Sequence, residues 1–548
     1  MTRAELASQV VVIGGGPAGS TAATMLARQG VAVLLLERDR FPRDHIGESL
    51  LPASIPVLEE LGVMPAMENA GFLRKWGATM VWGKESTPWS WYFKETNRRY
   101  LHSYQVWRPQ FDQLLLQNSR SHGVDVREGH QVVGVLFEGS RASGVRYRTD
   151  DGNLGTIRAS FVVDASGQGG LLARELDLRR WDPFFQNLAV YGYYSGAQPL
   201  PEPDETNIFI EAYPEGWLWS IPLHTGWTSV GAVVDSATGQ AGIAQSGPEK
   251  FLQSQIAQSS YLARMLEKAS LSAGPFIVKD WSYVCDRIVG DGYILTGDAA
   301  CFVDPLFSSG VHLALMSGVL AAAYVKTALK NPDMRKAAGS AYQELYFKEY
   351  SHFREMARLF YSSNLTADSY FWEARKLLEG AGNFSPRHAF IQAVAGQPPR
   401  GYERVVLDQG QAPPDFVASV QEVEAERARR RQTWQAALDR AQGSNYCLLN
   451  TVPRLAPEIE VQRKAVLGQG EFVWGHVLTT ISHPEGTPCS PLVAGLAALI
   501  DGHTSVDELI ATMRSQGNAG QPPQIEQSVL ATLEILYVDG TVAELKGL

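Results

Sequence analysis

The stretch VVVIGGGPAG at Val10–Gly19 decides the fold of this 548-residue chain. Its apolar start, Val10–Ile13, predicts a buried strand, and a G-x-G-x-x-G motif follows at once. The Ala-rich segment Ser20–Arg28 has helical spacing, Gly30 ends it, and Val31–Leu36 predicts a second buried strand. A strand, a helix and a second strand in this order make a βαβ unit, the building block of an α/β fold.

The glycines of this motif have the roles that a dinucleotide site requires. Gly14 permits the tight turn, Gly16 lets the backbone approach a pyrophosphate, and Gly19 lets the helix pack closely on the sheet. The helix N-terminus adds free N–H groups and a partial positive charge. Glu37 ends the second strand, where its carboxylate can accept a hydrogen bond from a ribose hydroxyl. A glycine turn that matches by chance is the alternative, but the flanks and the acid favour a nucleotide site.

Two later segments favour FAD over NAD as the dinucleotide. Asp164–Gly167 and Gly297–Ala300 each follow a predicted strand with an acid and small residues, as on the returning strands of two-domain FAD-binding folds. Arg108, with Phe111 and Asp112, fits a further helix that contacts the cofactor. We therefore assign ten residues to the cofactor: Gly14, Gly16, Ala18, Gly19, Glu37, Arg38, Arg108, Gly297, Asp298 and Pro305.

Composition and charge exclude several classes of protein. Hydrophobic residues make up 45% of the chain and charged residues 19%, which is ordinary globular composition. The net charge of −10 argues against nucleic-acid binding and against an anionic membrane surface. The four scattered cysteines and the absence of a C-x-x-C pair predict reduced thiols, no metal site and a cytoplasmic protein. We expect neither a signal peptide nor a membrane span.

Changes of pattern divide the chain into five predicted parts. Residues 1–180 form the first part of the FAD-binding domain, and 181–285, with short β-rich runs, form a β-sheet substrate region. Residues 286–395 return to the FAD-binding domain and add a helical segment. A linker with a charged helix follows at 396–458, and 459–548 form a small helical or winged-helix-like unit. The predicted fold class is α/β: a two-domain, Rossmann-like, aromatic-hydroxylase-type FAD-binding fold with a mostly helical C-terminal extension.

The segment Gly216–Pro222, GWLWSIP, contains W-x-W-x-I-P and resembles the characteristic motif of flavin-dependent halogenases. The resemblance covers about residues 8–370 and is closest to the chloramphenicol-pathway type. The other segments that carry it are FPR at Phe41–Arg43, GESLLP at Gly47–Pro52, Lys75 before GAT, DWSY at Asp280–Tyr283 and DPLFSSGVH at Asp304–His312.

The resemblance implies an oxidoreductase that uses FADH2, O2 and chloride. Such an enzyme oxidises chloride to hypochlorous acid and chlorinates a natural-product intermediate, as in antibiotic biosynthesis and other secondary metabolism. Electrophilic chlorine needs an electron-rich aromatic ring or an enolisable carbon. The resemblance also implies two partners: a separate NAD(P)H flavin reductase, and a small-molecule substrate that is free or tethered to a carrier protein.

Four residues receive roles around the oxidation step. Trp217 and Trp219 are expected to keep the organic substrate away from the flavin, although packing on one face of a strand explains them too. Ser309 and Gly310 open a predicted helix and are expected to offer backbone amides to chloride. A simply capped helix start is the alternative for this pair, and the resemblance favours the chloride site.

Lys75 is the residue that the resemblance implies for handling hypochlorous acid, either through a hydrogen bond from its ammonium or as a chloramine of its neutral amine. Glu48 is its expected carboxylate partner. Asp280 precedes the flavin strand and either forms an ester with the flavin 8α-methyl or is an ordinary hydrogen-bonded acid. Tyr346 and Tyr350 fit either the substrate side or helix packing equally well.

Two other functions compete with halogenation. One is an NAD(P)H-dependent FAD monooxygenase, a hydroxylase, or a reductase of the same fold; the W-x-W-x-I-P run argues against it. The other is a non-catalytic flavoprotein or a docking protein for carrier domains. Lys75 and the intact set of cofactor residues argue against a loss of activity.

Overall fold

The computed structural model describes residues 6–82, 87–95, 97, 99–363, 414–440, 446–457, 459–480, 483–515 and 522–547. The chain divides into two compact units. Of the described residues, 6–363 belong to the first unit and 414–547 belong to the second.

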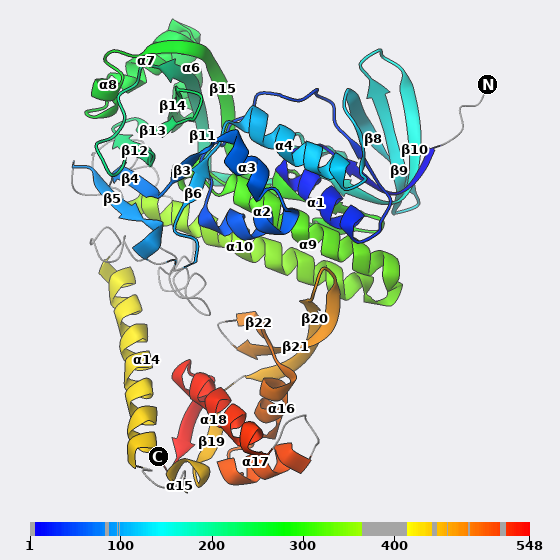
Figure 1. Ribbon diagram of the computed structural model, residues 1–548, viewed down its shortest axis with the longest axis vertical. Coiled ribbons are helices and arrows are strands. Elements are labelled where there is room, and N and C mark those ends of the chain that lie inside the picture. Colours follow the sequence, from blue (N-terminus) through cyan, green and yellow to red (C-terminus); the bar gives the residue numbers. More distant parts are fainter. Residues whose placement is uncertain are drawn as a thin grey trace. The chain divides into compact units, whose positions relative to one another are not determined.

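The first sheet of unit one contains the predicted βαβ start (Figure 1). Its strands run in the order β16 (Val289–Gly290), β17 (Tyr293–Leu295), β10 (Leu154–Asp164), β1 (Leu6–Ile13), β2 (Val33–Leu36) and β7 (Asp125–Arg127). The central strand β1 is parallel to both of its neighbours, with Val10 opposite Val33 and opposite Phe161. An antiparallel hairpin of β8 (His130–Glu138) and β9 (Arg141–Thr149) extends β10. Because parallel strands end at one edge, β1, β2, β10 and β17 bring their carboxyl ends together.

Helices cover this sheet and start at its functional edge. The α1 helix (Pro17–Arg28) packs against α9 (Gly310–Lys330) and α4 (Arg108–Ser121). The α9 helix is long and apolar enough to cross a membrane, but 83% of its most apolar window is buried inside the protein. It is therefore a core helix. It runs beside α10 (Arg335–Ser363) in Figure 1.

The second sheet of unit one is mostly antiparallel. Its strands run in the order β18 (Cys301–Phe302), β15 (Ser270–Cys285), β11 (Arg179–Ser195), β14 (Trp227–Asp235), β13 (Gly216–Pro222), β12 (Ile208–Tyr213), β4 (Gly77–Val81) and β5 (Trp89–Tyr92). Strands from residues 77–92 thus join the predicted substrate region 181–285, because β4 pairs in parallel with β12.

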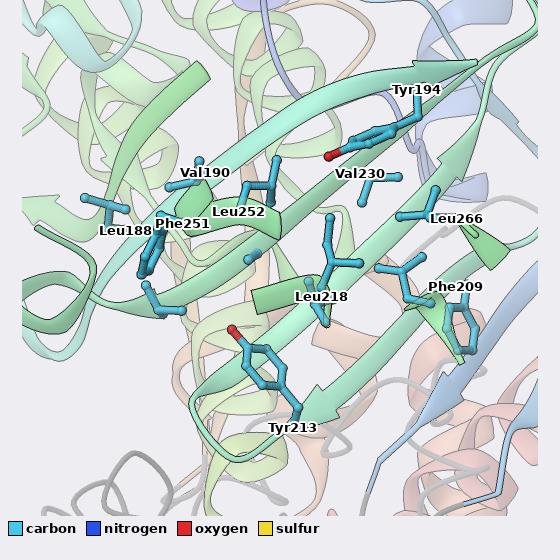
Figure 2. Close-up of a cluster of buried hydrophobic side chains, with 14 of the residues drawn as sticks. Leu188, Val190, Tyr194, Phe209, Tyr213, Leu218, Val230, Phe251, Leu252 and Leu266 are labelled. Carbon is cyan, nitrogen blue, oxygen red and sulfur yellow. The ribbon is translucent and has the colours of Figure 1, made fainter. Parts of the chain in front are cut away.

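Alternation along β13 gives this sheet two different faces. Leu218 points to one face, where it packs with strand residues such as Val190 and Val230 against Phe251 and Leu252 of α7 (Pro248–Ile256), as Figure 2 shows. Trp217 and Trp219 are its neighbours in sequence, so they lie on the opposite face. The hydrophobic cluster of Figure 2 therefore serves packing, and the opposite face, which carries the two indoles, is the one available for a functional site.

The α10 helix is held to the end of β17 by tyrosines. Tyr342 donates a hydrogen bond to the carbonyl of Leu295 (2.8 Å), and Tyr346 donates one to the carbonyl of Gly297 (3.0 Å). Both side chains are fully buried, and Tyr350 is buried as well. The structure therefore favours helix packing, the second of the two interpretations of Tyr346 and Tyr350.

Unit two combines helices with two small sheets. Trp434 and Ala437 of its first helix pack with Leu509, Met513 and Leu533, so the predicted charged helix shares one core with the tail that follows it. One sheet pairs β19 with β23, and the other has the order β20-β21-β22. The elements are α14 (Pro414–Arg440), α15 (Tyr446–Leu449), β19 (Val452–Leu455), β20 (Glu460–Leu467), β21 (Phe472–Thr480), β22 (His483–Cys489), α16 (Pro491–Leu499), α17 (Val506–Ser515), α18 (Pro522–Val538) and β23 (Val542–Lys546).

Candidate active site

A cavity of about 560 Å³ lies in unit one and is lined by residues of both sheets. Most of the residues assigned from the sequence face it, although they come from distant parts of the chain. Ser309, Lys75, Gly19 and Gly297 are not among its lining residues. Those that line it are Gly14, Gly16, Ala18, Glu37, Arg38, Glu48, Arg108, Trp217, Trp219, Asp298, Pro305 and Gly310.

The glycine turn after β1 is shaped for a close-lying ligand. Gly14 has a φ of +98°, and a Cβ there would lie 2.4 Å from the carbonyl oxygen of Ala165. A Cβ on Gly19 would lie 2.0 Å from the carbonyl oxygen of Gly14. A Cβ on Gly16, by contrast, would meet only the Arg43 guanidinium, so the backbone of Gly16 is open toward the cavity. With α1 starting at Pro17, this turn fits a pyrophosphate.

Glu37 is fixed at the end of β2 by two backbone donors. The N–H groups of Gly15 (2.7 Å) and Asp39 (2.8 Å) each bind one of its carboxylate oxygens. The side chain is buried on the cavity wall, so its remaining lone pairs can accept from a ribose hydroxyl. Arg38 is largely exposed and pairs with Asp39 at 3.2 Å.

A buried charge cluster holds the segment before GESLLP. Arg108 binds both carboxylate oxygens of Asp112 (2.8 and 2.9 Å) and donates to the carbonyl of Ile46. Arg43 also approaches Asp112, at 3.4 Å. Burial, and then the Arg108 charge, lower the pKa of His45 to about 4. The cluster therefore places arginine side chains at the cavity without leaving a buried cation unpaired.

The acid after β17 also faces the cavity. Burial raises the pKa of Asp298 to about 6, against the opposing effect of Arg108 and Arg179. Gly297 itself packs on α1, because a Cβ there would lie 2.8 Å from the Cβ of Ala18. Glycine at this position therefore brings β17 close to the glycine turn, which fits the same cofactor.

Trp217 and Trp219 form part of the cavity wall. Their side chains are buried, with 2% and 5% exposure, and their ring centres lie 6.0 Å apart. The Trp219 indole N–H donates to the hydroxyl of Ser229 (3.2 Å), and that of Trp217 donates to the hydroxyl of Tyr361 (2.6 Å). Both indoles are thus held in single orientations on the site face of the sheet.

Glu48 is a buried carboxyl group on the cavity wall. Burial raises its pKa, while hydrogen bonds from its own segment, Tyr193 and Ser229 partly oppose the shift. The Tyr193 hydroxyl lies 3.0 Å from one carboxylate oxygen, and the N–H of Gly47 lies 3.1 Å from the other. Glu48 therefore keeps its proton at higher pH than an exposed glutamate would.

Lys75 ends β3 (Leu73–Lys75) and is 2% exposed. Its Nζ donates to the carbonyl of Leu50 (3.2 Å) and lies 5.5 Å from the ring centre of Phe93. Burial alone lowers its pKa to about 7. The amine is therefore in an apolar environment in which its neutral form is well populated near neutral pH.

The predicted pairing of Lys75 with Glu48 does not form. Lys75 pairs with Ser103 on β6 (Ser103–Gln105), while the segment of Glu48 lies along the other edge of the same strand. Leu50 belongs to the same segment as Glu48, and Lys75 donates to its carbonyl, whereas the Glu48 carboxylate accepts from the Tyr193 hydroxyl and the Gly47 N–H. The two elements lie close together, as expected, but the lysine and the carboxylate have different hydrogen-bond partners.

Replacing Lys75 with methionine should stabilise the protein in a pH-dependent way. The pKa of Lys75 is about 7 when folded and 10.5 ordinarily, so between these values the unfolded chain binds the extra proton. Wild-type stability should therefore rise with pH across this window. The advantage of Lys75→Met in free energy of unfolding should be largest at pH 7 and below, and should shrink toward pH 10.

Urea unfolding at several pH values measures this advantage, with Lys94→Met at an exposed site as the control. An advantage that does not change with pH would contradict the burial of a titrating amine.

The start of α9 carries the residues that were assigned to chloride from the sequence. Asp304 caps the short turn Pro305–Phe307, Ser308 takes a left-handed conformation (φ 56°), and Ser309 is the N-cap residue of α9. The first N–H groups of a helix have no intrahelical partner. The buried Ser309 hydroxyl also has no hydrogen-bond partner among the described residues. Free backbone amides and this hydroxyl therefore lie at the helix start, and Gly310 there reaches the cavity.

Asp280 lies on β15, where its backbone pairs with Asn187 of β11. Its side chain lies outside the described part of the structure. The cavity also uses residues that the sequence did not single out, among them Tyr191 and Val278. The aromatic run on β11 was the available signal, since alternate residues of a strand share a face.

Fold and cavity together define the class as an FAD-dependent oxidoreductase. In agreement, residues 9–175 match the family model described as FAD dependent oxidoreductase. Residues 94–404, more than half of the chain, match the model described as Tryptophan halogenase. The chain therefore belongs to the tryptophan halogenase family, and it is a flavin-dependent halogenase. The resemblance seen in the sequence is confirmed.

Individual relatives agree with this assignment. The chain is 38% identical over 392 residues to a tryptophan 2-halogenase of Chondromyces crocatus, covering 71% of this chain and 74% of the relative. It is 33% identical over 394 residues to a 1H-pyrrole-2-carbonyl-peptidyl-carrier-protein chlorinase of Pseudomonas fluorescens, covering 68% and 87%. The crystal structure of the flavin-dependent halogenase CmlS matches with a TM-score of 0.72 and 28% identity, covering 99% of this chain and 96% of that one.

Proposed function

We propose that this halogenase oxidises chloride beside the flavin and transfers the chlorine to substrate at a separate place, the amine of Lys75. The observation that supports two separate places of reaction is where the structure puts the two indoles and the lysine amine. The indoles of Trp217 and Trp219 line the cavity, while Lys75 is buried outside its lining. Bulky indoles on the wall exclude an organic substrate from the cofactor, whereas a small oxidant can pass.

The cofactor residues proposed for FAD fit its parts. Gly14, Gly16 and the α1 N-terminus would hold the pyrophosphate, Glu37 a ribose hydroxyl, and Arg108 and Asp298 the central part of the cofactor. When bound in its reduced form, FAD would supply two electrons that activate O2, and O2 would supply the oxidising equivalents that convert chloride to hypochlorous acid. Ser309 and Gly310 would hold the chloride with backbone N–H groups, to which an anion binds without needing a side-chain cation.

Lys75 and Glu48 would handle protons and chlorine. With a pKa of about 7, the Lys75 amine can attack the chlorine of hypochlorous acid, which forms a chloramine and releases water. The amine then gives the electrophilic chlorine to an electron-rich or enolisable carbon and regains a proton. Glu48, whose pKa burial raises, would act as a proton donor on the cavity wall rather than as the charge partner of Lys75.

We also propose Asp280 as a contact of FAD at its benzene edge, since β15 runs beside the cavity through Val278. Precipitation in acid distinguishes the two forms of this contact. A yellow pellet in the wild type and a colourless one in Asp280→Ala would show an ester bond. Complete release of FAD from both proteins would leave a noncovalent contact and contradict the ester.

The partners follow from the same proposal. Reduced flavin would come from a separate NAD(P)H flavin reductase. The carrier-protein chlorinase among the relatives supports a substrate tethered to a carrier protein. We place the enzyme in the cytoplasm, which suits the free thiols of Cys285, Cys301 and Cys489.

Mass spectrometry tests the function directly. The protein is incubated with FAD, a flavin reductase, NADH, chloride and candidate aromatic substrates, each free or bound to a carrier protein. We expect a product in which chlorine replaces hydrogen, shown by the chlorine isotope pattern. A hydroxylated product, together with substrate-stimulated NADPH oxidation in the absence of any reductase, would instead support the hydroxylase alternative.

A further inference from the structure

A group of buried hydrogen bonds holds the indole of Trp217 from behind. The Tyr361 hydroxyl accepts from the indole N–H of Trp217 (2.6 Å) and donates to a carboxylate oxygen of Asp304 (2.8 Å). The amide of Asn187 donates to the same carboxylate oxygen (3.0 Å) and to the Tyr361 hydroxyl (3.2 Å). All four side chains are 2% exposed or less. One hydroxyl thus joins β13, β11, the end of α10 and the turn before α9.

Asp304, a member of this hydrogen-bonded group, also fixes the start of the loop that is proposed to hold chloride. The second carboxylate oxygen of Asp304 accepts from the N–H of Leu306 (3.1 Å), and the N–H of Asp304 donates to the hydroxyl of Ser282 (2.9 Å). Four residues after Leu306, Gly310 reaches the cavity. The position of the Asp304 carboxylate therefore determines where the loop begins.

The end of α10 is fixed independently, so the Tyr361 hydroxyl has a defined place. The ring of Phe360 packs edge-to-face on Phe307, with 4.7 Å between ring centres. The indole N–H of Trp82 donates to the carbonyl of Phe360 (3.0 Å). Tyr361 also contacts the rings of Trp82 and Phe185. These contacts hold the hydroxyl between the indole and the loop.

We propose that Tyr361 is a positioning residue that couples halide oxidation to substrate chlorination. Its hydroxyl selects one orientation of the Trp217 indole, because a flipped ring would leave a buried N–H without a partner. The same hydroxyl holds Asp304. Through Asp304 it also holds the halide loop, which is the segment from Pro305 to Gly310 that is proposed to bind chloride. The proposal rests on the proposed function, because it assumes that the two indoles and the halide loop guide the oxidant toward Lys75. Tyr361 itself is not among the lining residues of the cofactor cavity.

Tyr361→Phe removes the hydroxyl and keeps the ring that packs in the core. We expect the yield of chlorinated product per flavin oxidised to fall about three- to tenfold, which is the usual weight of one buried hydrogen bond. The KM for chloride should rise, while FAD affinity and the rate of flavin oxidation should change little. Oxidant that escapes can be trapped with a chlorine-accepting dye and should increase correspondingly.

Tyr213→Phe is the matched control. Tyr213 lies on the neighbouring strand β12 and donates a buried hydrogen bond to Gln255 (2.7 Å), on the side of the sheet shown in Figure 2. It should lose similar stability without changing yield per flavin or KM for chloride. Equal losses of yield in both variants would overturn the proposal, because they would indicate general destabilisation.

A double-mutant cycle tests whether Tyr361 acts through Trp217. At saturating chloride, Trp217→Phe alone should lower the yield, and adding Tyr361→Phe should cost little more, although the KM for chloride should still rise because the hydroxyl also holds Asp304. Losses that multiply would overturn the proposed route through the indole.

Hydrogen exchange at the Trp217 indole separates this proposal from the failure of the proposed function. In protein with isotope-labelled tryptophan, the Trp217 N–H signal is assigned with Trp217→Phe. It should exchange slowly in wild type and in Tyr213→Phe, and much faster in Tyr361→Phe. This readout needs no halogenation, so it stands even if no chlorinated product is found. Unchanged exchange in Tyr361→Phe would overturn the positioning role.

Discussion

Lys75→Ala is expected to abolish chlorination, with a loss of about a thousandfold or more, while FAD binding and flavin oxidation continue. The side chain lies outside the cofactor cavity, so its removal leaves the glycine turn, Glu37 and the arginine cluster in place. In the proposed mechanism, the Lys75 amine is the group that accepts the chlorine and passes it to the substrate. Without it, hypochlorous acid lacks the acceptor that we propose for it and diffuses into the solvent.

The measurement compares chlorinated product with free oxidant in the same reaction. In Lys75→Ala the product should disappear while a chlorine-trapping dye still reacts. Lys94→Ala, which removes an exposed lysine stacked on Tyr92, should keep wild-type activity. Full chlorination by Lys75→Ala would remove Lys75 from the mechanism.

Gly19→Ala should lower FAD affinity by about a hundredfold or more, since overlap with backbone cannot be relieved by a rotamer change. The added Cβ would lie 2.0 Å from the Gly14 carbonyl oxygen and 3.2 Å from the Cβ of Ala165. Either α1 moves away from the sheet or the glycine turn opens. In both cases the N–H groups that face the pyrophosphate lose their geometry.

Flavin fluorescence during titration with FAD measures this loss. Gly139→Asn is the control, because Gly139 has a φ of 62° at an open turn where a Cβ meets nothing within 4 Å. Asparagine tolerates this left-handed conformation. Tight FAD binding by Gly19→Ala would mean that helix and sheet need not pack closely at this turn.

Local sequence patterns predicted the parts of the site that depend on nearby residues. The glycine turn depends on a few consecutive residues, and Trp217 and Trp219 share a face because strands alternate. The spacing of residues along the chain was therefore enough to predict the glycine turn and the shared face of the two indoles. The start of α9 was readable for the same reason, from Asp304 to Gly310, but the Ser309 hydroxyl does not cap it.

Partnerships across long distances were not predictable in this way. Lys75 donates to the Leu50 carbonyl, and the Glu48 carboxylate is instead held by Tyr193, which lies 145 residues further along the chain. Tyr361 follows Trp217 by 144 residues, and its helix pattern is that of any buried aromatic face. The charged helix before the tail gave no sign that Trp434 belongs to the core of unit two.

Two helix starts, those of α1 and α9, reach the same cavity wall through Gly16 and Gly310. Their attraction for anions comes from peptide dipoles, which neither gain nor lose protons. A chain with a net charge of −10 can therefore present a locally favourable place for anions without a titrating cation. A change of pH that alters the charge of Lys75 would leave the contribution of these two helix starts unchanged. Any loss of anion binding at higher pH would therefore report on the carboxyl groups of Asp298 and Glu48, which line the same cavity, and not on the helix dipoles.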